Sequence, residues 1–232
     1  MRTILSISLI LLTLSMFGQN VILQETVTNV TEKPKHGPNC RFFNHFYFSF
    51  GINPTLQSGE TEVFLLSSNR VTLGNRQIFR LNNYIATGFN IELSTSNFKV
   101  KQNENNQRLD SMFHEKERYI FKDLSGSWFI RLNFDKRRGK YIGHFMDLGA
   151  YGGYNFSRQR FVKDITTENS ITKIWYKQPD YLNAFQYGVF VRIGLNRYVI
   201  YSGYRLSDLI DTSKGLTQLP AFTFGLEVGF HK

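Results

Sequence analysis

Six charged residues share one feature: each lies on the polar face of a segment whose opposite face is apolar. They are Glu92, Asp147, Glu227, Arg131, Arg192 and Arg205. The set has balanced charge, and guanidinium and carboxylate groups form strong bidentate hydrogen bonds when they meet. Glycines recur on the same faces and leave room for bulky neighbours. We therefore expect these side chains to form an ion network in an enclosed space, the alternative being that they are solvated surface charges.

A second group of residues could support covalent chemistry. Ser111, His114, Glu115 and Glu117 lie within seven positions of one another, and a hydroxyl, an imidazole and a carboxylate are the parts of an activated nucleophile. The alternative is a charged, solvated loop. No G-x-S-x-G, phosphate-binding loop, H-E-x-x-H or cysteine pair is present, and Cys40 is the single cysteine. The sequence therefore predicts a protein that is not an enzyme and that needs no cofactor or metal.

The composition limits the class of protein. Lys and Arg number 28 against 18 Asp and Glu, which gives a formal net charge of +10 and favours anionic partners. Aromatic residues make up 16% of the chain, with 22 Phe and 12 Tyr, and there are 18 Gly. Strand-forming aromatic residues with many glycines are more typical of a β protein at a water–lipid boundary than of a nucleic-acid-binding protein. We expect no nucleic-acid partner.

The N-terminal residues have the pattern of an export signal. A short positive start is followed by the uncharged apolar run 4–17, and small and polar residues follow it. The run is shorter than the roughly 20 residues of a membrane-spanning helix, so we expect a cleaved signal peptide over 1–19. Residues 20–40 are polar and lack periodicity, which predicts a flexible leader, and 41–232 is the folded domain. With no later long apolar run and a mean hydropathy of −0.29, a helical membrane protein is excluded.

From Phe42 onward the hydrophobic pattern has a period of two, the spacing of a strand with unlike faces. In the segment 222–230, for example, large apolar residues alternate with Thr223, Gly225, Glu227 and Gly229. The pattern predicts eight strands, at about 42–52, 83–93, 98–102, 128–134, 142–154, 185–193, 198–206 and 222–230. Most of these match the roughly 9–11 residues with which a tilted strand crosses a bilayer.

The connections between these segments alternate in length. Short, turn-like connections are expected at 94–97, 135–140 and 194–197, and long polar ones at 54–82, 103–126, 157–183 and 207–218. Short periplasmic turns and long extracellular loops alternate in this way in outer-membrane barrels. The sequence therefore predicts an all-β fold, an eight-stranded antiparallel up-and-down transmembrane β-barrel, with both ends of the folded domain on the periplasmic side.

The two faces of the strands predict which side meets lipid. If the aromatic face contacts lipid, the six charged residues lie in the lumen, and an eight-stranded barrel is narrow enough for side chains to fill it. A soluble barrel with the same strands inverted is the alternative. Outside the apolar segments lie several basic residues that either pair with lipopolysaccharide phosphates or only keep the loops soluble. These are Lys35, Arg158, Arg160, Lys163, Lys173 and Lys177.

The segments FYFSFGIN, YIATGFNIEL, GHFMDLGAYGGYNF and LPAFTFGLEVGF, together with the export signal, resemble the small outer-membrane β-barrel, or porin-like, domain family of Gram-negative bacteria. The resemblance covers roughly residues 41–232 and is a pattern of strands. It implies an up-and-down barrel inserted by the outer-membrane assembly machinery, and it implies no catalytic residues. The chain departs from the family in ending Phe230-His231-Lys232 rather than on an aromatic residue.

These observations lead to one expected function and its alternatives. We expect a non-enzymatic protein of the cell outer membrane that acts through its extracellular loops in a structural, adhesive or complex-forming role. Its expected partners are outer-membrane lipids and lipopolysaccharide, with the assembly machinery during insertion. The alternatives are an outer-membrane subunit of a secretion or gliding machinery, a narrow pore, or a lipid A-modifying enzyme.

Overall fold

The computed structural model of the chain describes residues 37, 40–57, 59–102, 114–135, 141–165, 171–211 and 217–230. The expected signal peptide at 1–19 lies outside the described residues, as does the leader at 20–40 apart from Gly37 and Cys40. The described part of the folded domain belongs to one compact unit, Pro34–Lys232. Among the described residues, no helix is long and apolar enough to cross a membrane.

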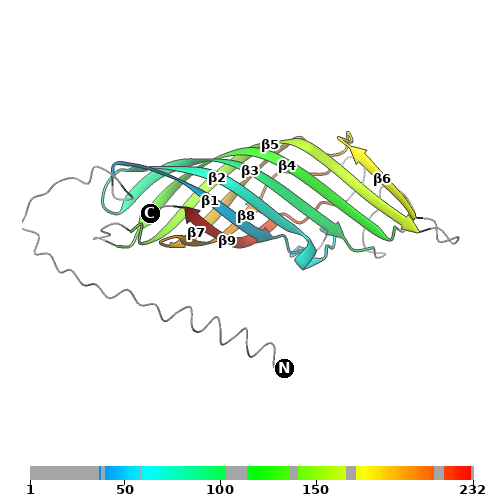
Figure 1. Cartoon of the computed structure of the whole chain (residues 1–232), viewed down its shortest axis with the longest axis horizontal. Helices are drawn as coiled ribbons and strands as arrows, with labels where there is room; N and C mark the ends of the chain where they lie inside the picture. The colour runs from blue at the N-terminus through cyan, green and yellow to red at the C-terminus, as the bar shows by residue number, and fades with distance from the viewer. Residues whose placement is uncertain are drawn as a thin grey trace, which may run out of the picture. The chain divides into compact units, whose positions relative to one another are not determined.

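The described residues form strands and one short 3-10 helix (Figure 1). In chain order the elements are β1 (Phe42–Ile52), η2 (Leu65–Ser67), β2 (Asn69–Arg80), β3 (Ile85–Val100), β4 (Lys116–Asn133), β5 (His144–Ile165), β6 (Ile171–Lys177), β7 (Phe185–Leu195), β8 (Tyr198–Arg205) and β9 (Phe222–Phe230).

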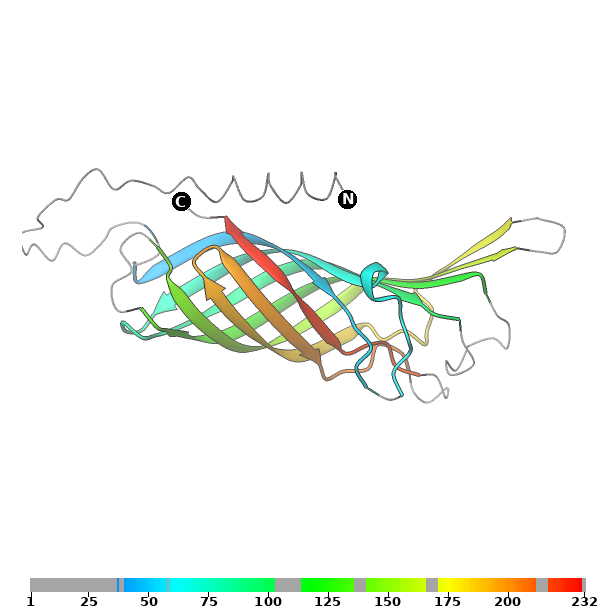
Figure 2. The same ribbon diagram turned by 90° about the horizontal axis from the view of Figure 1, so that it is seen from below.

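The strands close into a ring. Each of β1 to β5 pairs antiparallel with the next, β5 pairs with β7, and β7, β8 and β9 continue in order. Pairing of β9 with β1 completes the circle (Figure 2). The fold is thus an all-β, eight-stranded antiparallel up-and-down barrel, as the sequence predicted. β6 pairs with the far end of β5 and extends the sheet beyond the ring.

The predicted assignment of strands was wrong at β2 and β3, and the predicted loops 103–126 and 157–183 contain the long-loop ends of β4 and β5 and the whole of β6. β2 lies inside the segment 54–82, which was predicted to be a long loop. Its outward positions include Asn75 and Gln77 and its inward positions include Arg70 and Arg76, so neither face is uniformly apolar. The expected period-two signal is therefore missing, although the backbone pairs with β1 along its whole length.

A compensating error kept the predicted number of strands correct. The segment 94–97 was predicted to be a turn and 98–102 a separate strand, but β3 runs without interruption from Ile85 to Val100. Polar residues occupy both faces at Ser94, Thr95, Ser96 and Asn97. Such a run resembles a turn in composition, yet each of these residues pairs with β2 and β4.

The alternation of short and long connections is retained with corrected boundaries. Short connections lie at 81–84, 134–143 and 196–197, and long ones at 53–68, 101–115, 166–184 and 206–221. We call the two ends of the barrel the short-turn end and the long-loop end. The tight connection at 196–197 has Asn196 at a φ of 60°, a left-handed conformation that asparagine tolerates better than most residues.

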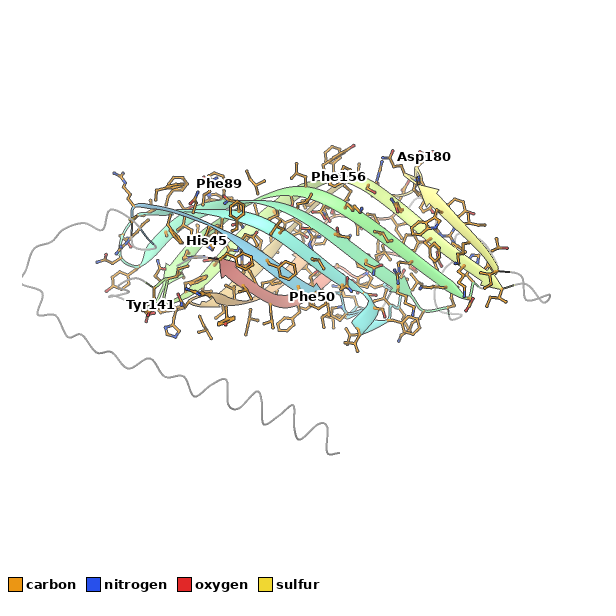
Figure 3. The ribbon with its side chains drawn as sticks, in the orientation of Figure 1. His45, Phe50, Phe89, Tyr141, Phe156 and Asp180 are labelled. Carbon is orange, nitrogen blue, oxygen red and sulfur yellow. The ribbon has the colours of Figure 1, made fainter. Side chains whose placement is uncertain are left out.

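Burial alternates along the strands with the large apolar residues on the outside. On β1, Phe46, Phe48 and Phe50 are exposed, whereas His45, Tyr47 and Ser49 are buried. Figure 3 shows Phe89 and Phe156 extending outward from the ribbon. This arrangement is the reverse of a soluble barrel and contradicts the inverted alternative.

Candidate functional site: the lumen and the loop-end cap

The best-defined ion pair in the lumen joins neighbouring strands. Arg131 on β4 lies directly opposite Asp147 on β5. Its Nε and Nη2 atoms donate to the two carboxylate oxygens at 2.7 and 2.8 Å, so the pair is bidentate. The side chains are 2% and 0% exposed. A charged pair this deeply buried requires both partners, because either charge alone would lack compensation.

A second group of charges crosses the lumen. Arg76 on β2 donates to Glu227 on β9, with Nη1 2.6 Å from Oε1 and Nη2 2.8 Å from Oε2. Arg192 on β7 reaches the same carboxylate at 3.9 Å. Because these strands are not neighbours in the ring, this group ties opposite walls of the barrel together.

Glu92 is held by hydrogen bonds rather than by an arginine. Tyr47 donates to its carboxylate at 2.6 Å and Ser127 at 3.2 Å. Ser127 also accepts from the amide of Asn90, which in turn accepts from Nε of Arg76. The chain of contacts therefore links Glu92 to the Arg76–Glu227 pair.

Aromatic rings fill the space between these charges. The Phe129 ring, fully buried, has the guanidinium carbons of Arg76, Arg131 and Arg192 at 5.8, 5.6 and 5.1 Å from its centre. Arg131 also lies 3.5 Å from the ring centre of Phe145. Cations over aromatic faces gain electrostatic attraction, and more so where water is excluded.

Two glycines make this packing possible. A Cβ atom at Gly194 would overlap the ring of Phe145, and one at Gly74 would lie 2.5 Å from Cζ of Tyr47. Any larger residue at either position would displace the ring that packs there. Gly194 lies on a strand that was predicted from the sequence, whereas Gly74 lies on β2, in the segment that was predicted to be a loop.

Nearer the long-loop end the lumen is more polar. Arg70 donates to Asp123 at 2.9 Å and to Ser96 at 3.1 Å. Beside them lies a cavity of about 70 Å³, lined in part by Tyr151 and Tyr201, which has room for several water molecules.

Of the six predicted lumen residues, Arg205 alone is held by the backbone. It donates to the carbonyl oxygens of Ser207, Leu219 and Pro220. The structure brings together Arg131 with Asp147 and Arg192 with Glu227. Glu92 is connected to Glu227 by the hydrogen bonds that run through Ser127, Asn90 and Arg76. Sequence reasoning missed Arg76 and Arg70, because both lie on the strand that was taken for a loop.

The described parts of three long loops pack together into what we call the loop-end cap. Its apolar core combines three loops with β3 and β4 and consists of Val63, Phe98, Val100, Tyr119, Phe121, Tyr181, Leu182, Leu209, Ile210 and Leu219. Isolated bridges join Glu60 to Gln218, Val63 to Val100 and Leu182 to Ile210. The cap is thus a packed structure rather than a set of independent loops.

A buried ion pair supports the cap from one side. Nε of Arg160 donates to Glu117 at 2.7 Å, and the hydroxyl of Tyr119 donates to the same oxygen at 2.8 Å. Burial, and then the nearby Glu117 carboxylate, raise the pKa of Tyr119 well above its ordinary value, and burial also raises the pKa of Tyr181. Arg160 is therefore not one of the exposed basic residues that its sequence position suggested.

The residues considered for covalent chemistry have structural partners. His114 is 7% exposed and its Nδ1 lies 2.8 Å from Asp164. Glu115 pairs with Lys163 at 2.8 Å, and Glu117 pairs with Arg160. Ser111 lies outside the described residues. Among the described residues no group of three or more His, Cys, Asp or Glu side chains could hold a metal ion.

Comparisons with known proteins add little to this geometry. No family model matches the chain, and no curated protein matches it. Among solved structures, the chain is similar to Ail, the attachment invasion locus protein of Yersinia pestis, crystallised with the heparin analogue sucrose octasulfate. The identity is 12%, the alignment covers 81% of this chain and 97% of that chain, and the TM-score is 0.37.

Proposed function

We propose that this chain is a non-enzymatic, sealed β-barrel of the bacterial outer membrane that acts through its loop-end cap. The observation that carries the proposal is a band of exposed apolar side chains around a lumen of buried ion pairs. A water-soluble protein rarely exposes apolar patches of this extent, whereas a lipid-facing wall requires one.

The height of the band fits a bilayer. On β4 the outward residues from Leu124 to Leu132 all carry large apolar side chains except Gly126. Phe134, which is also exposed and apolar, follows the end of the strand. At about 3.3 Å per residue and a tilt near 40°, the ten steps from Leu124 to Phe134 span roughly 25 Å. Transmembrane barrels have an outward apolar band of about 25 Å. The outward amides of Asn44, Asn75 and Gln77 are exceptions within the band.

The contents of the lumen support a structural barrel over a narrow pore. The Arg76–Glu227 pair and Arg192, which reaches the same carboxylate, cross the lumen beside Phe129, and the Arg131–Asp147 pair joins neighbouring strands next to them. An ion would have to separate buried, bidentate pairs to pass. Enzymatic modification of lipid A has less support, because His114, Glu115 and Glu117 are engaged in structural contacts.

The proposal is tested by expression with export and by gel migration. The full chain should fractionate with the outer membrane, and the folded protein should migrate faster in detergent gels before heating than after it. A matched variant, Leu124→Asp/Ile130→Asp, places two charges in the outward band and should lose membrane insertion. Recovery of wild-type protein in the soluble periplasmic fraction, with no shift on heating, would refute the proposal.

A further inference from the structure

The sheet continues beyond the apolar band as a projecting wall. The upper parts of β3, β4 and β5 stay paired past Leu93, Leu124 and Phe156, and β6 adds a further strand (Figure 2). On β3 and β4 one face of this wall packs on the core of the cap, whereas all residues of β6 are exposed. The other face is continuous with the lipid-facing surface below it, and we call it the outer wall face.

The outer wall face is strongly basic. Register places Lys99 opposite Arg118, Lys116 opposite Lys163, and Lys163 opposite Lys173 on this face. Its cations are Lys99, Lys101, Lys116, Arg118, Lys122, Lys163, Lys173 and Lys177. Like charges directly opposite each other on paired strands repel, so this arrangement costs stability unless an anion lies against it.

Few carboxylates neutralise these cations. Lys163 pairs with Glu115 at 2.8 Å and Lys101 with Glu62 at 3.8 Å. For the other six, no carboxylate of a described residue lies within the 4.0 Å of a salt bridge. The neighbouring cations lower the pKa of Lys116 by disfavouring its charged form. The largest contribution comes from Arg118, followed by burial and then by Lys99 and Lys163.

Aromatic side chains accompany the charges on this face. The rings of Phe161 and Trp175 pack with their centres 4.6 Å apart, and Lys99 lies 4.5 Å from the ring centre of Phe64. Amphipathic aromatic rings beside basic groups are typical of surfaces at the headgroup level of a membrane.

The cations begin where the apolar band ends. Lys122 is the next outward residue of β4 after Leu124, and Ile120, Arg118 and Lys116 follow in turn on the same face. The eight steps from Leu124 to Lys116 rise roughly 20 Å by the same strand geometry. If the proposed membrane location is correct, the outer wall face therefore lies in the anionic sugar and phosphate layer of the surrounding leaflet.

From this placement we infer that the outer wall face binds the phosphate groups of an anionic glycolipid, of the lipid A type, in the same membrane. Lys122 is placed to meet the phosphates nearest the acyl chains, and Arg118 and Lys116 meet the anionic groups above them. Ammonium and guanidinium groups form short charge-assisted hydrogen bonds with phosphate oxygens. This inference rests on the proposed membrane location.

The test uses the full mature chain in nanodiscs of phosphatidylcholine, titrated with bisphosphorylated lipid A. The chain has two tryptophans, so a Trp128→Phe background leaves Trp175 as the fluorescent reporter on the outer wall face. Native mass spectrometry counts the bound lipid independently. Arg118→Gln/Lys122→Gln is the wall variant. Arg41→Gln/Arg197→Gln removes the same charge from exposed residues next to the short-turn end.

We expect lipid A to bind the wild type and the short-turn variant alike, and the wall variant roughly 30-fold more weakly, since each of the two cations near an anionic surface contributes about fivefold. Dephosphorylated lipid A should bind as weakly as the wall variant does. The inference is overturned if both variants lose the same affinity for lipid A, or if dephosphorylated lipid A binds the wild type as tightly as lipid A does. It is also overturned if soluble sucrose octasulfate binds the wild type as tightly as lipid A does. Heat-dependent gel migration of the same samples reports the barrel independently of lipid A binding.

Discussion

Removing one partner of the Arg131–Asp147 pair should cost more stability than any other change of one charge that we predict. Asp147→Ala leaves a guanidinium group whose side chain is 2% exposed without its two hydrogen bonds of 2.7 and 2.8 Å. Hydrogen bonds to charged groups are each worth about 1.5–3 kcal/mol, and breaking a buried pair costs about 3–5 kcal/mol. We therefore expect the free energy of unfolding to fall by about 3–5 kcal/mol.

Urea unfolding in phospholipid vesicles measures this change, with tryptophan fluorescence and heat-dependent migration as probes. Glu62→Ala is the control, because it breaks the Lys101 pair, whose side chains are 46% and 41% exposed, and should cost about 1 kcal/mol or less. Arg131→Met/Asp147→Leu removes both charges and should remain within about 1 kcal/mol of the wild type. The reasoning is refuted if Asp147→Ala costs no more than Glu62→Ala, or if the double variant is as unstable as the single one.

Three further predictions concern packing, titration and conduction. Gly194→Ala should destabilise the barrel by about 1–3 kcal/mol, because its Cβ would overlap the Phe145 ring, whereas Gly152→Ala, with no atom near the new Cβ, should have little effect in the same urea assay. The pKa of Tyr119 is raised in the folded protein, so its neutral hydroxyl stabilises the cap below the unfolded-state pKa near 10. This stability is lost as the pH rises through the folded-state pKa. In limited proteolysis between pH 9 and 12, the Tyr119→Phe variant should therefore lose less resistance to cleavage than the wild type. The wild type should give no conductance above baseline in planar bilayers, and discrete channels would contradict a sealed lumen.

The ring could be predicted from the sequence where a strand stays within the apolar band. β1 and β9 have the predicted bounds, 42–52 and 222–230, and β7 and β8 differ from theirs by two residues or fewer. In these strands every outward position meets the proposed lipid and most inward positions are small or polar, so the period of two is visible. The closed order of strands followed from these segments and the alternating connections.

β2 could not be found by the same rule. Asn75 and Gln77 interrupt its outward face, and Arg70 and Arg76 face inward, so the segment has the composition of a polar loop. The partners of the lumen charges depended on this strand: Arg76 pairs with Glu227, and Arg205 turns to backbone carbonyls instead. Balanced charge among six residues was therefore not a guide to which residues pair.

The same strands show why the pattern changes at a definite height. On β4 below Leu124, the outward residues are apolar and the inward residues, such as Ser127 and Arg131, are polar. Above Leu124 the faces exchange character: Phe121 is buried in the cap while Lys122 is outward and exposed. β3 reverses in the same way after Leu93. Such a reversal is expected where lipid surrounds a barrel on one side of a boundary and water on the other, so we take it as the edge of the proposed membrane. A search for segments with one apolar face ends each strand at this height, because the apolar residues change faces there. For this reason the segment 94–97 was wrongly predicted to be a turn.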